Sequence, residues 1–193
     1  MKSPFIVGLS SWIIQDGNYE DFKRGDQVAF ALEFYSPSGL SVLEEGYHVA
    51  SLERLHSSVY QIVGRVIHVH DGEWWVIDAG ILMYREERPP FGVEEDCWVS
   101  GEVYIGVDPF PYFETLSLHH TAPGLIYDWI IKKIEIQTAP FIKGDEGHLV
   151  RDPERLAWRE IDATNAGPDG FGAEYVLHCE RLDRQPRRLL RLS

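Results

Sequence analysis

Two histidines lie two residues apart in the stretch VIHVHDGEWWVIDAG, which covers residues 66–80. On a β-strand His68 and His70 would point to the same face, where imidazole nitrogens can bind a transition metal. A metal centre would need a third ligand, for which the chain offers Asp71, Asp78, His119 and His120. A lone HxH pair is a weak signal, and the Asp71-Gly72 dipeptide after it is typical of a hairpin turn. We therefore predict no bound metal, and keep a metal-dependent hydrolase built on His68 and His70 as an alternative.

Other familiar catalytic arrangements are missing from the sequence. The stretch GLSSW (residues 8–12) is not the G-x-S-x-G turn that exposes a nucleophilic serine. Neither Cys97 nor Cys179 has the basic, exposed surroundings of a reactive thiolate, so we expect buried thiols and no disulfide. The glycines at 167, 170 and 172 follow no strand of the kind that a dinucleotide-binding fingerprint requires. The sequence predicts no catalytic residue and no cofactor, and it favours a non-enzymatic role.

Aromatic side chains recur on one face of the strands expected between residues 73 and 107. Alternation along these strands groups them with two carboxylates, and the predicted binding residues are Trp74, Asp78, Tyr84, Trp98, Glu102 and Tyr104. Tyr and Trp are enriched at the positions that dominate the energetics of protein interfaces. The alternative is structural, because an N-terminal hairpin or the C-terminal segment would make this face a second core by covering it.

The chain is acidic, with 31 Asp and Glu against 18 Lys and Arg and a formal net charge of −13. Residues 181–193 form an Arg-rich tail with five arginines and one aspartate, which is +4, so residues 1–180 carry −17. Such a body repels a phosphate backbone and attracts cationic surfaces, including the arginines of its own tail. We therefore expect a basic protein partner and disfavour nucleic acid. One concrete form of this hypothesis is an immunity or inhibitor protein that neutralises a basic toxin or nuclease.

The elements that would position these residues are mostly strands. Period-two alternation predicts strands over 4–15 and 27–35, which would form an N-terminal hairpin, and over 60–70, 73–84 and 97–107. Residues 125–140 are rich in β-branched side chains and indicate a long strand, and 173–182 indicate a final one. Between these two, Asp152 and Pro153 are residue types typical of the start of a helix.

Three segments, GRV (64–66), VIDAG (76–80) and SGEVYIGVD (100–108), resemble the early strands of an OB-fold barrel, and the resemblance covers about residues 60–140. It implies a mainly β fold with a single antiparallel OB-like barrel, to which the N-terminal hairpin and a C-terminal helix plus strand are added. A β-meander sheet packed on one helix is the alternative. OB-folds serve many functions, so the resemblance implies no activity, and an OB-type nucleic-acid-binding protein is a further alternative.

We expect residues 1–193 to form a single domain, with 60–140 as the barrel core. No apolar run approaches the roughly 20 residues that a membrane-spanning helix needs. The first residues also lack the pattern of a secretory signal peptide. We therefore expect no membrane association and a cytoplasmic location.

Overall fold

The computed structural model of the protein describes residues 4–44, 46, 48–143, 149–167, 170, 172–182 and 185–188. The fold is mainly β, as the sequence predicts. In chain order the strands are β1 (Phe5–Ser10), β2 (Gln27–Phe30), β3 (Leu32–Tyr35), β4 (Ser41–Val42), β5 (Ser51–His56), β6 (Val59–His70), β7 (Trp74–Asp78), β8 (Leu82–Arg85), β9 (Trp98–Val107), β10 (Tyr127–Gln137), β11 (Phe141–Lys143), β12 (Leu149–Arg151), β13 (Trp158–Ile161) and β14 (Glu174–Arg181). The helical turns are α1 (Ser11–Gln15), α2 (Pro111–Glu114), η1 (Leu116–Leu118) and η2 (Pro153–Arg155). No described helix has the length and apolar character needed to cross a membrane.

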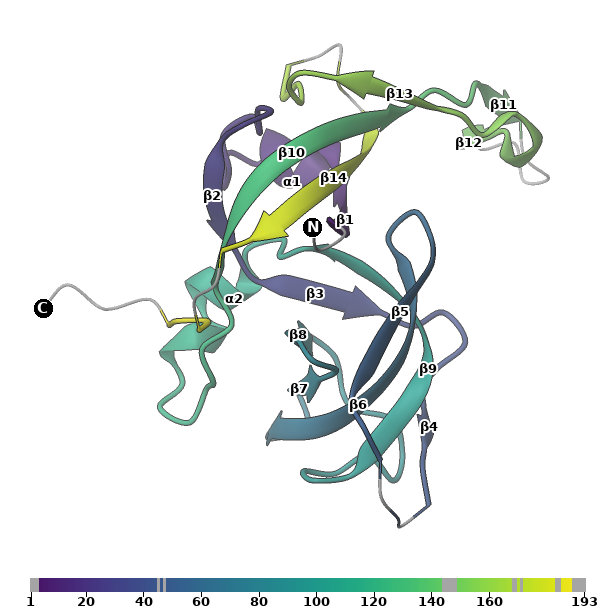
Figure 1. Ribbon diagram of the computed structural model, residues 1–193. Helices are drawn as coiled ribbons and strands as arrows, with labels where there is room; N and C mark the ends of the chain where they lie inside the picture. Colours follow the sequence, from purple (N-terminus) through teal and green to yellow (C-terminus); the bar gives the residue numbers. More distant parts are fainter. Residues whose placement is uncertain are drawn as a thin grey trace, which may run out of the picture.

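Five strands close a barrel, in the lower half of Figure 1. β6 pairs with β7, β7 with β8, β8 with β3, β3 with β9, and β9 with β6, so the ring of pairings is complete. Four of these pairings are antiparallel, whereas β3 and β8 run parallel where Glu33 lies beside Tyr84. The predicted barrel is therefore confirmed, but the expectation that it is purely antiparallel is wrong.

The strand that closes the barrel comes from outside residues 60–140. The strand predicted over 27–35 divides at Ala31 into β2, which pairs with β10, and β3, which pairs with β9 and β8. Phe30, Ala31 and Leu32 are all fully buried, so the alternation of buried and exposed side chains breaks here. This is the point where the chain passes from pairing with β10 to pairing with β9. β10, which was expected in the barrel core, lies outside the ring and pairs with β2, β13 and β14.

A curved layer of strands lies above the barrel (Figure 1). Within it β14 pairs with both β10 and β1, and β1 reaches the barrel where Gly8 lies beside Gly106 of β9. The expected N-terminal hairpin is therefore wrong, because β1 pairs with β14 and β9 and not with the strand that follows it. Its four central residues are all buried, and the Tyr60 hydroxyl exchanges two hydrogen bonds of 2.9 Å with the Ile6 backbone. An apolar strand of this kind fits between two others and not in a surface hairpin.

The expected C-terminal helix is also wrong. The Asp152 carboxylate does accept a hydrogen bond of 3.0 Å from the Glu154 N–H, as a capping residue would. The helix nevertheless ends after the single 3-10 turn η2, and the next strand, β13, pairs with β10. Residues 154–157 are all exposed, so this segment has no neighbouring surface against which a longer helix would pack.

The hairpin predicted at Asp71-Gly72 is confirmed. Both residues have positive φ, +46° and +72°, and the Glu73 N–H donates to the His70 carbonyl at 2.8 Å. The register places Trp75, Ile77 and Ala79 in the main core, as the alternation predicts. Both cysteines are free thiols, with Cys179 buried and Cys97 half-buried.

Part of the Arg-rich tail contacts the acidic body. Arg187 forms an ion pair of 2.9 Å with Asp128, and the Arg188 guanidinium donates to the carbonyls of Ser117, His119 and His120. Residues 183, 184 and 189–193 of the tail lie outside the described residues. Arg188 thus ties this part of the tail to the segment that contains η1, and Arg187 ties it to β10.

Candidate functional site

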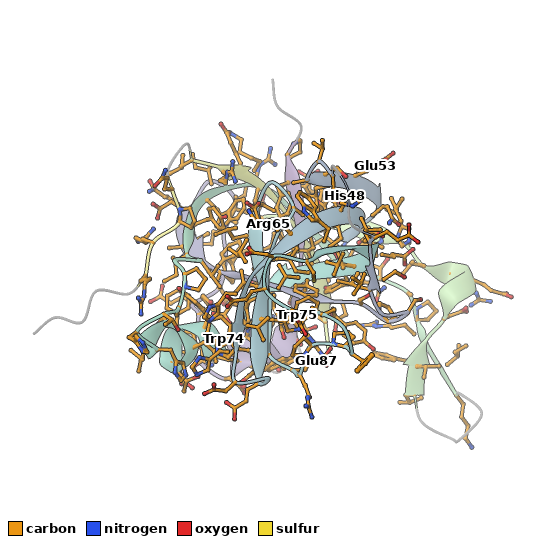
Figure 2. All side chains as sticks on the ribbon, turned by 90° about the horizontal axis from the view of Figure 1, so that it is seen from below. His48, Glu53, Arg65, Trp74, Trp75 and Glu87 are labelled. Atoms are coloured by element: carbon orange, nitrogen blue, oxygen red, sulfur yellow. The ribbon has the colours of Figure 1, made fainter. Side chains whose placement is uncertain are left out.

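The predicted aromatic face divides into a buried and an accessible part. Trp74 and Tyr84 are fully buried in a second apolar cluster (Figure 2 labels Trp74 and its neighbour Trp75). The rest of this cluster comes mainly from the connection over residues 110–126, whose Tyr112, Leu116 and Leu125 pack on the outer face of the barrel. Trp74 and Tyr84 therefore belong to a second core, which was the alternative to a binding face. The segment that covers them is neither the N-terminal strand nor the C-terminal one.

The other four predicted binding residues are less buried and have different surroundings. Asp78 accepts a hydrogen bond of 2.9 Å from the Gly80 N–H within its own turn. Trp98 is half-buried with its ring 5.6 Å from that of His48, and Glu102 is exposed. Tyr104 lines a pocket that the other five residues do not reach. Tyr104 therefore connects the predicted face to the site described next.

The histidines considered as metal ligands do approach each other. The ring of His119 lies 4.0 Å from that of His70, and the ring of His68 lies 4.7 Å from that of Trp74. Burial lowers the pKa of His68, and its Nε2 has no hydrogen-bond partner. Even so, no group of three or more His, Cys, Asp or Glu side chains in the described parts of the chain is arranged to hold a metal ion. The cluster packs the connection over 110–126 onto the hairpin.

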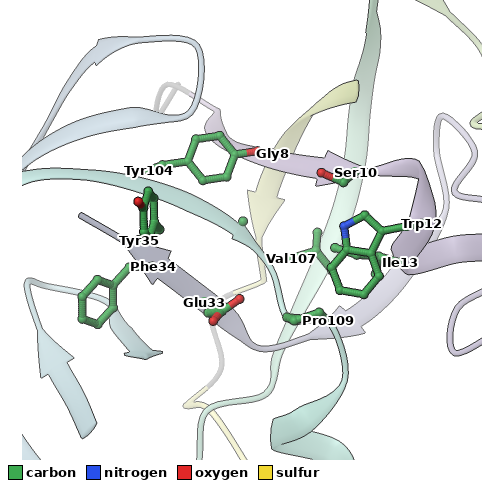
Figure 3. A pocket seen from close by; sticks show the side chains of 11 residues that line it. Gly8, Ser10, Trp12, Ile13, Glu33, Phe34, Tyr35, Tyr104, Val107 and Pro109 are labelled. Atoms are coloured by element: carbon green, nitrogen blue, oxygen red, sulfur yellow. The ribbon is translucent and has the colours of Figure 1, made fainter. Parts of the chain in front are cut away.

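A pocket opens between α1, β1, β3 and β9 (Figure 3). Trp12 lines one side, Tyr35 and Tyr104 line the other, and the Glu33 carboxylate lies between them. Gly8 and Gly106 form part of the floor, and a Cβ atom at Gly8 would lie only 1.6 Å from the Tyr104 hydroxyl oxygen. Glycine at this position therefore lets the Tyr104 ring lie against β1.

The Glu33 carboxylate has unusual electrostatic surroundings. Arg85 donates to it at 3.2 Å, and the same guanidinium donates to Glu87 at 2.8 Å and lies over the Tyr35 ring, 5.0 Å from its centre. Burial, together with the nearby carboxylates of Asp108 and Glu86, nevertheless raises the pKa of Glu33 to about 7 against the lowering effect of Arg85. Glu33 therefore changes charge close to neutral pH.

Asp108 is fully buried, and its two chain neighbours, Val107 and Pro109, line the pocket. Its Oδ1 accepts hydrogen bonds from the Tyr84 hydroxyl and from the backbone N–H of Phe110, at 3.0 Å, while its Oδ2 has no partner. Burial raises the pKa of Asp108 to about 6, although these hydrogen bonds act in the opposite direction. The carboxylate joins the barrel to the start of the connection over 110–126.

The loop between β8 and β9 carries the most exposed aromatic side chain of the described residues. Phe91 is fully exposed, at the second position of a turn in which the Val93 N–H donates to the Pro90 carbonyl at 3.1 Å. Gly92 has a φ of +84°, the value that the next position of a type II turn requires. Exposed carboxylates flank this turn on both sides: Glu86, Glu87, Glu94, Glu95 and Asp96. We call residues 86–96 the acidic loop.

Several contacts hold the acidic loop on the barrel. Val93 is buried, so the turn is anchored directly after its exposed phenylalanine. The Glu95 carboxylate accepts from the Val69 N–H at 2.9 Å, and Asp96 pairs with Arg65 at 2.7 Å. Two prolines precede Phe91 and restrict the backbone further. These contacts hold the backbone that follows Phe91 on the barrel.

Sequence reasoning missed Phe91, Trp12 and Glu33. For Phe91 a signal was present, because Pro-Pro-Phe-Gly between acidic runs indicates a turn with an outward aromatic residue. Trp12 was placed in a strand, whereas the chain turns there into α1. Comparisons of the chain with protein-family models, curated proteins and solved structures found no match.

Proposed function

We propose that the protein is a non-catalytic binding protein for a basic protein partner, and that the acidic loop is the centre of the interface. The observation that carries this proposal is Phe91, a fully exposed aromatic side chain on an anchored turn between carboxylates. An aromatic anchor inserted into a pocket of the partner supplies binding energy at the centre of an interface. Because Val93, Glu95 and Asp96 anchor the loop on the barrel, its backbone should lose less conformational entropy on binding than a loop without such contacts.

Charge supports the choice of partner. The net charge of −13 speeds encounter with a cationic surface, and the carboxylates around Phe91 concentrate negative charge at the anchor. A phosphate backbone would be repelled by the same surface. An immunity or inhibitor protein that blocks a basic toxin or nuclease is the concrete form of this role that we propose.

We also retain the OB-type barrel as a proposal about the fold. The five strands pair in the ring order of an OB-fold, in which a three-strand meander (here β6, β7 and β8) is closed by two further strands. The strand parallel to the end of the meander comes last in an OB-fold, whereas here it is β3, which precedes the meander in the chain. This pairing order supports our proposal that the mixed five-strand barrel is a permuted OB-type barrel.

The test is a quantitative pull-down from the native cell with mass spectrometry. Wild-type protein is compared with Phe91→Ala, with the triple variant Glu86→Gln, Glu87→Gln, Glu94→Gln, and with the control Phe141→Ala. Phe141 is also an exposed aromatic residue, but it lies on the β11–β12 hairpin away from the acidic loop (Figure 1).

We expect a stoichiometric basic protein whose affinity falls about 30-fold or more in Phe91→Ala, as for an interface hot spot. Its affinity should also fall in the triple variant, and more so at low salt. The control should bind as the wild type does. A partner that binds the wild type and Phe91→Ala equally well would contradict the proposal.

A further inference from the structure

The pocket of Figure 3 is an aromatic enclosure with one carboxylate. Two of its aromatic rings are accessible to solvent: Trp12 is 51% exposed and Tyr35 is 48% exposed. Trp12 faces Tyr35 and Tyr104 across the pocket, and Glu33 lies between the two sides. Aromatic faces carry partial negative charge, so a ligand with a positive charge gains from each of them.

The charges around the pocket also favour a cation. Arg85 is the guanidinium that contacts Glu33, and it is shared with Glu87. Glu86 and Asp108 add negative potential at the same carboxylate. The neighbourhood of Glu33 therefore contains more carboxylates than the one guanidinium can neutralise.

The small number of acceptors in the pocket restricts the kind of cation. A primary ammonium brings three N–H donors, which all need acceptors when they leave water. Here the Glu33 carboxylate is already shared with Arg85, and the other residues that line the pocket are mainly aromatic or apolar. An ammonium whose hydrogens are replaced by methyl groups needs no directional acceptor and packs on aromatic rings instead.

We propose that this pocket binds a small alkylated ammonium ion, with Trp12, Tyr35 and Tyr104 as the walls around its methyl groups and Glu33 as its counter-ion. This ligand site is additional to the proposed role of the acidic loop and does not depend on it. The natural ligand is defined by this chemistry as a quaternary or methylated amine.

The test uses choline as the probe and 3,3-dimethyl-1-butanol, which has the same shape without the charge, as the matched neutral compound. Binding is followed through the ligand methyl signals by saturation-transfer NMR on the full-length protein at constant ionic strength. We expect saturable choline binding and affinity at least about tenfold lower for the neutral compound, since the cation–π and ionic contributions are both lost.

Variants of the pocket separate the two contributions. Trp12→Leu and Tyr35→Leu should each weaken choline binding about threefold to tenfold, and Glu33→Gln should weaken it to a similar extent. Phe141→Leu is the matched control, because Phe141 is 49% exposed and does not line the pocket. Phe91→Ala is a second control, and both controls should bind choline as the wild type does. Circular dichroism shows that each variant is folded before it is titrated.

A pH series tests the role of Glu33. The groups that act on it are Arg85 from β8, Asp108 after β9, and Glu86 of the acidic loop. Because the pKa of Glu33 is about 7, choline should bind more tightly at pH 8 than at pH 6 and should lower that pKa on binding. In Glu33→Gln most of the difference between pH 6 and pH 8 should be lost, and the remainder should reflect the ionisation of Asp108.

Three outcomes would overturn the proposal. The first is equal affinity for choline and the neutral compound, which would show a merely apolar pocket. The second is unchanged choline binding in Trp12→Leu and Tyr35→Leu, which would place the ligand elsewhere. The third is the absence of saturable binding by the folded wild-type protein at pH 8.

Discussion

The two faces of β7 are both buried, but for different reasons. Trp75 and Ile77 point into the barrel, which encloses them by closing on itself, and the Phe34 ring lies 5.1 Å from that of Trp75. Trp74 and Val76 point outward and are buried because the connection over 110–126 covers them. The inner face is thus buried by the sheet alone, whereas the outer face depends on a distant segment and on the contacts that hold it.

The composition of the two faces differs accordingly. Apolar side chains surround Trp75, whereas Trp74 is surrounded by the rings of His68, His70 and His119. The Tyr84 hydroxyl, on the same outer side, donates to the buried Asp108. Changes in pH should therefore act on the outer face and leave the inner face largely unaffected.

The largest expected effect is that of Trp75→Ala. Removing this fully buried ring from a closed core should lower the free energy of unfolding by about 3 to 5 kcal/mol. Trp74→Ala should cost less, about 2 to 3 kcal/mol, because the covering segment can move inward to fill part of the space. Urea unfolding curves of both variants measure the difference, and a larger loss for Trp74→Ala would reverse the comparison.

The next effect concerns Asp108, whose pKa is raised to about 6 from 3.8 in the unfolded chain. The folded protein binds the proton of the Asp108 carboxyl more tightly than the unfolded chain does. The stabilisation that results is present at pH 4 and is lost as the pH rises through 6. Over that window Asp108 should lower the free energy of unfolding by on the order of 3 kcal/mol.

Asp108→Asn has no such titration, so urea unfolding at pH 4, 5, 6 and 7 should show a flatter pH profile than the wild type. Glu154→Gln, at an exposed carboxylate, is the control and should follow the wild-type profile. Parallel profiles for Asp108→Asn and the wild type would show that Asp108 ionises normally.

A smaller effect is expected from Arg188→Met, which removes the donor to the three carbonyls of Ser117, His119 and His120. The loss should be about 1 to 2 kcal/mol and should be confined to the outer face. Hydrogen exchange should therefore become faster over 112–126 and stay unchanged in β6 and β9. The exposed Arg155 provides the control, as Arg155→Met, and equal acceleration in every strand would contradict a local role.

The smallest effect is that of His68. Burial lowers its folded pKa below 6.5, so its neutral form stabilises the protein above pH 6.5 and this contribution is lost as the pH falls below that value. Protonation of Asp108 acts in the opposite direction over this range, so the effect of His68 is measured as a difference between variants. Acidification from pH 7 to 5.5 should speed intrinsically corrected hydrogen exchange over 112–126 by a few-fold relative to the same acidification of His68→Gln. His56→Gln, on the exposed strand β5, should respond as the wild type does.

The inner face of β7 could be predicted because alternation and the Asp71-Gly72 turn are local signals. Which strands pair is a non-local property, so nothing in residues 27–35 shows that β3 closes the barrel. Asp152 illustrates the same limit, since its capping hydrogen bond was predictable while the length of the helix depended on a surface to pack against, and residues 154–157 are exposed.

The candidate site was predicted only in part for a related reason. Alternation shows that Trp74, Tyr84 and Tyr104 share a face, but it does not show what covers each of them. Tyr104 lines the pocket because Gly8 of another strand leaves room for its ring, and Glu33 reaches the same pocket from β3. Sites of this kind are assembled by long-range pairing, which a periodic pattern does not encode.

The position of β3 in the chain has a consequence for synthesis on the ribosome. Tyr35 leaves the ribosome 72 residues before Val107, the last residue of its neighbour β9. Ribosomes add about 5 to 20 residues per second, so roughly 4 to 14 seconds pass between the synthesis of β3 and the completion of β9. During that time the barrel that buries the apolar residues of β3 has not formed, so the nascent chain exposes an apolar strand. We expect chaperones to shield this strand until β9 is synthesised.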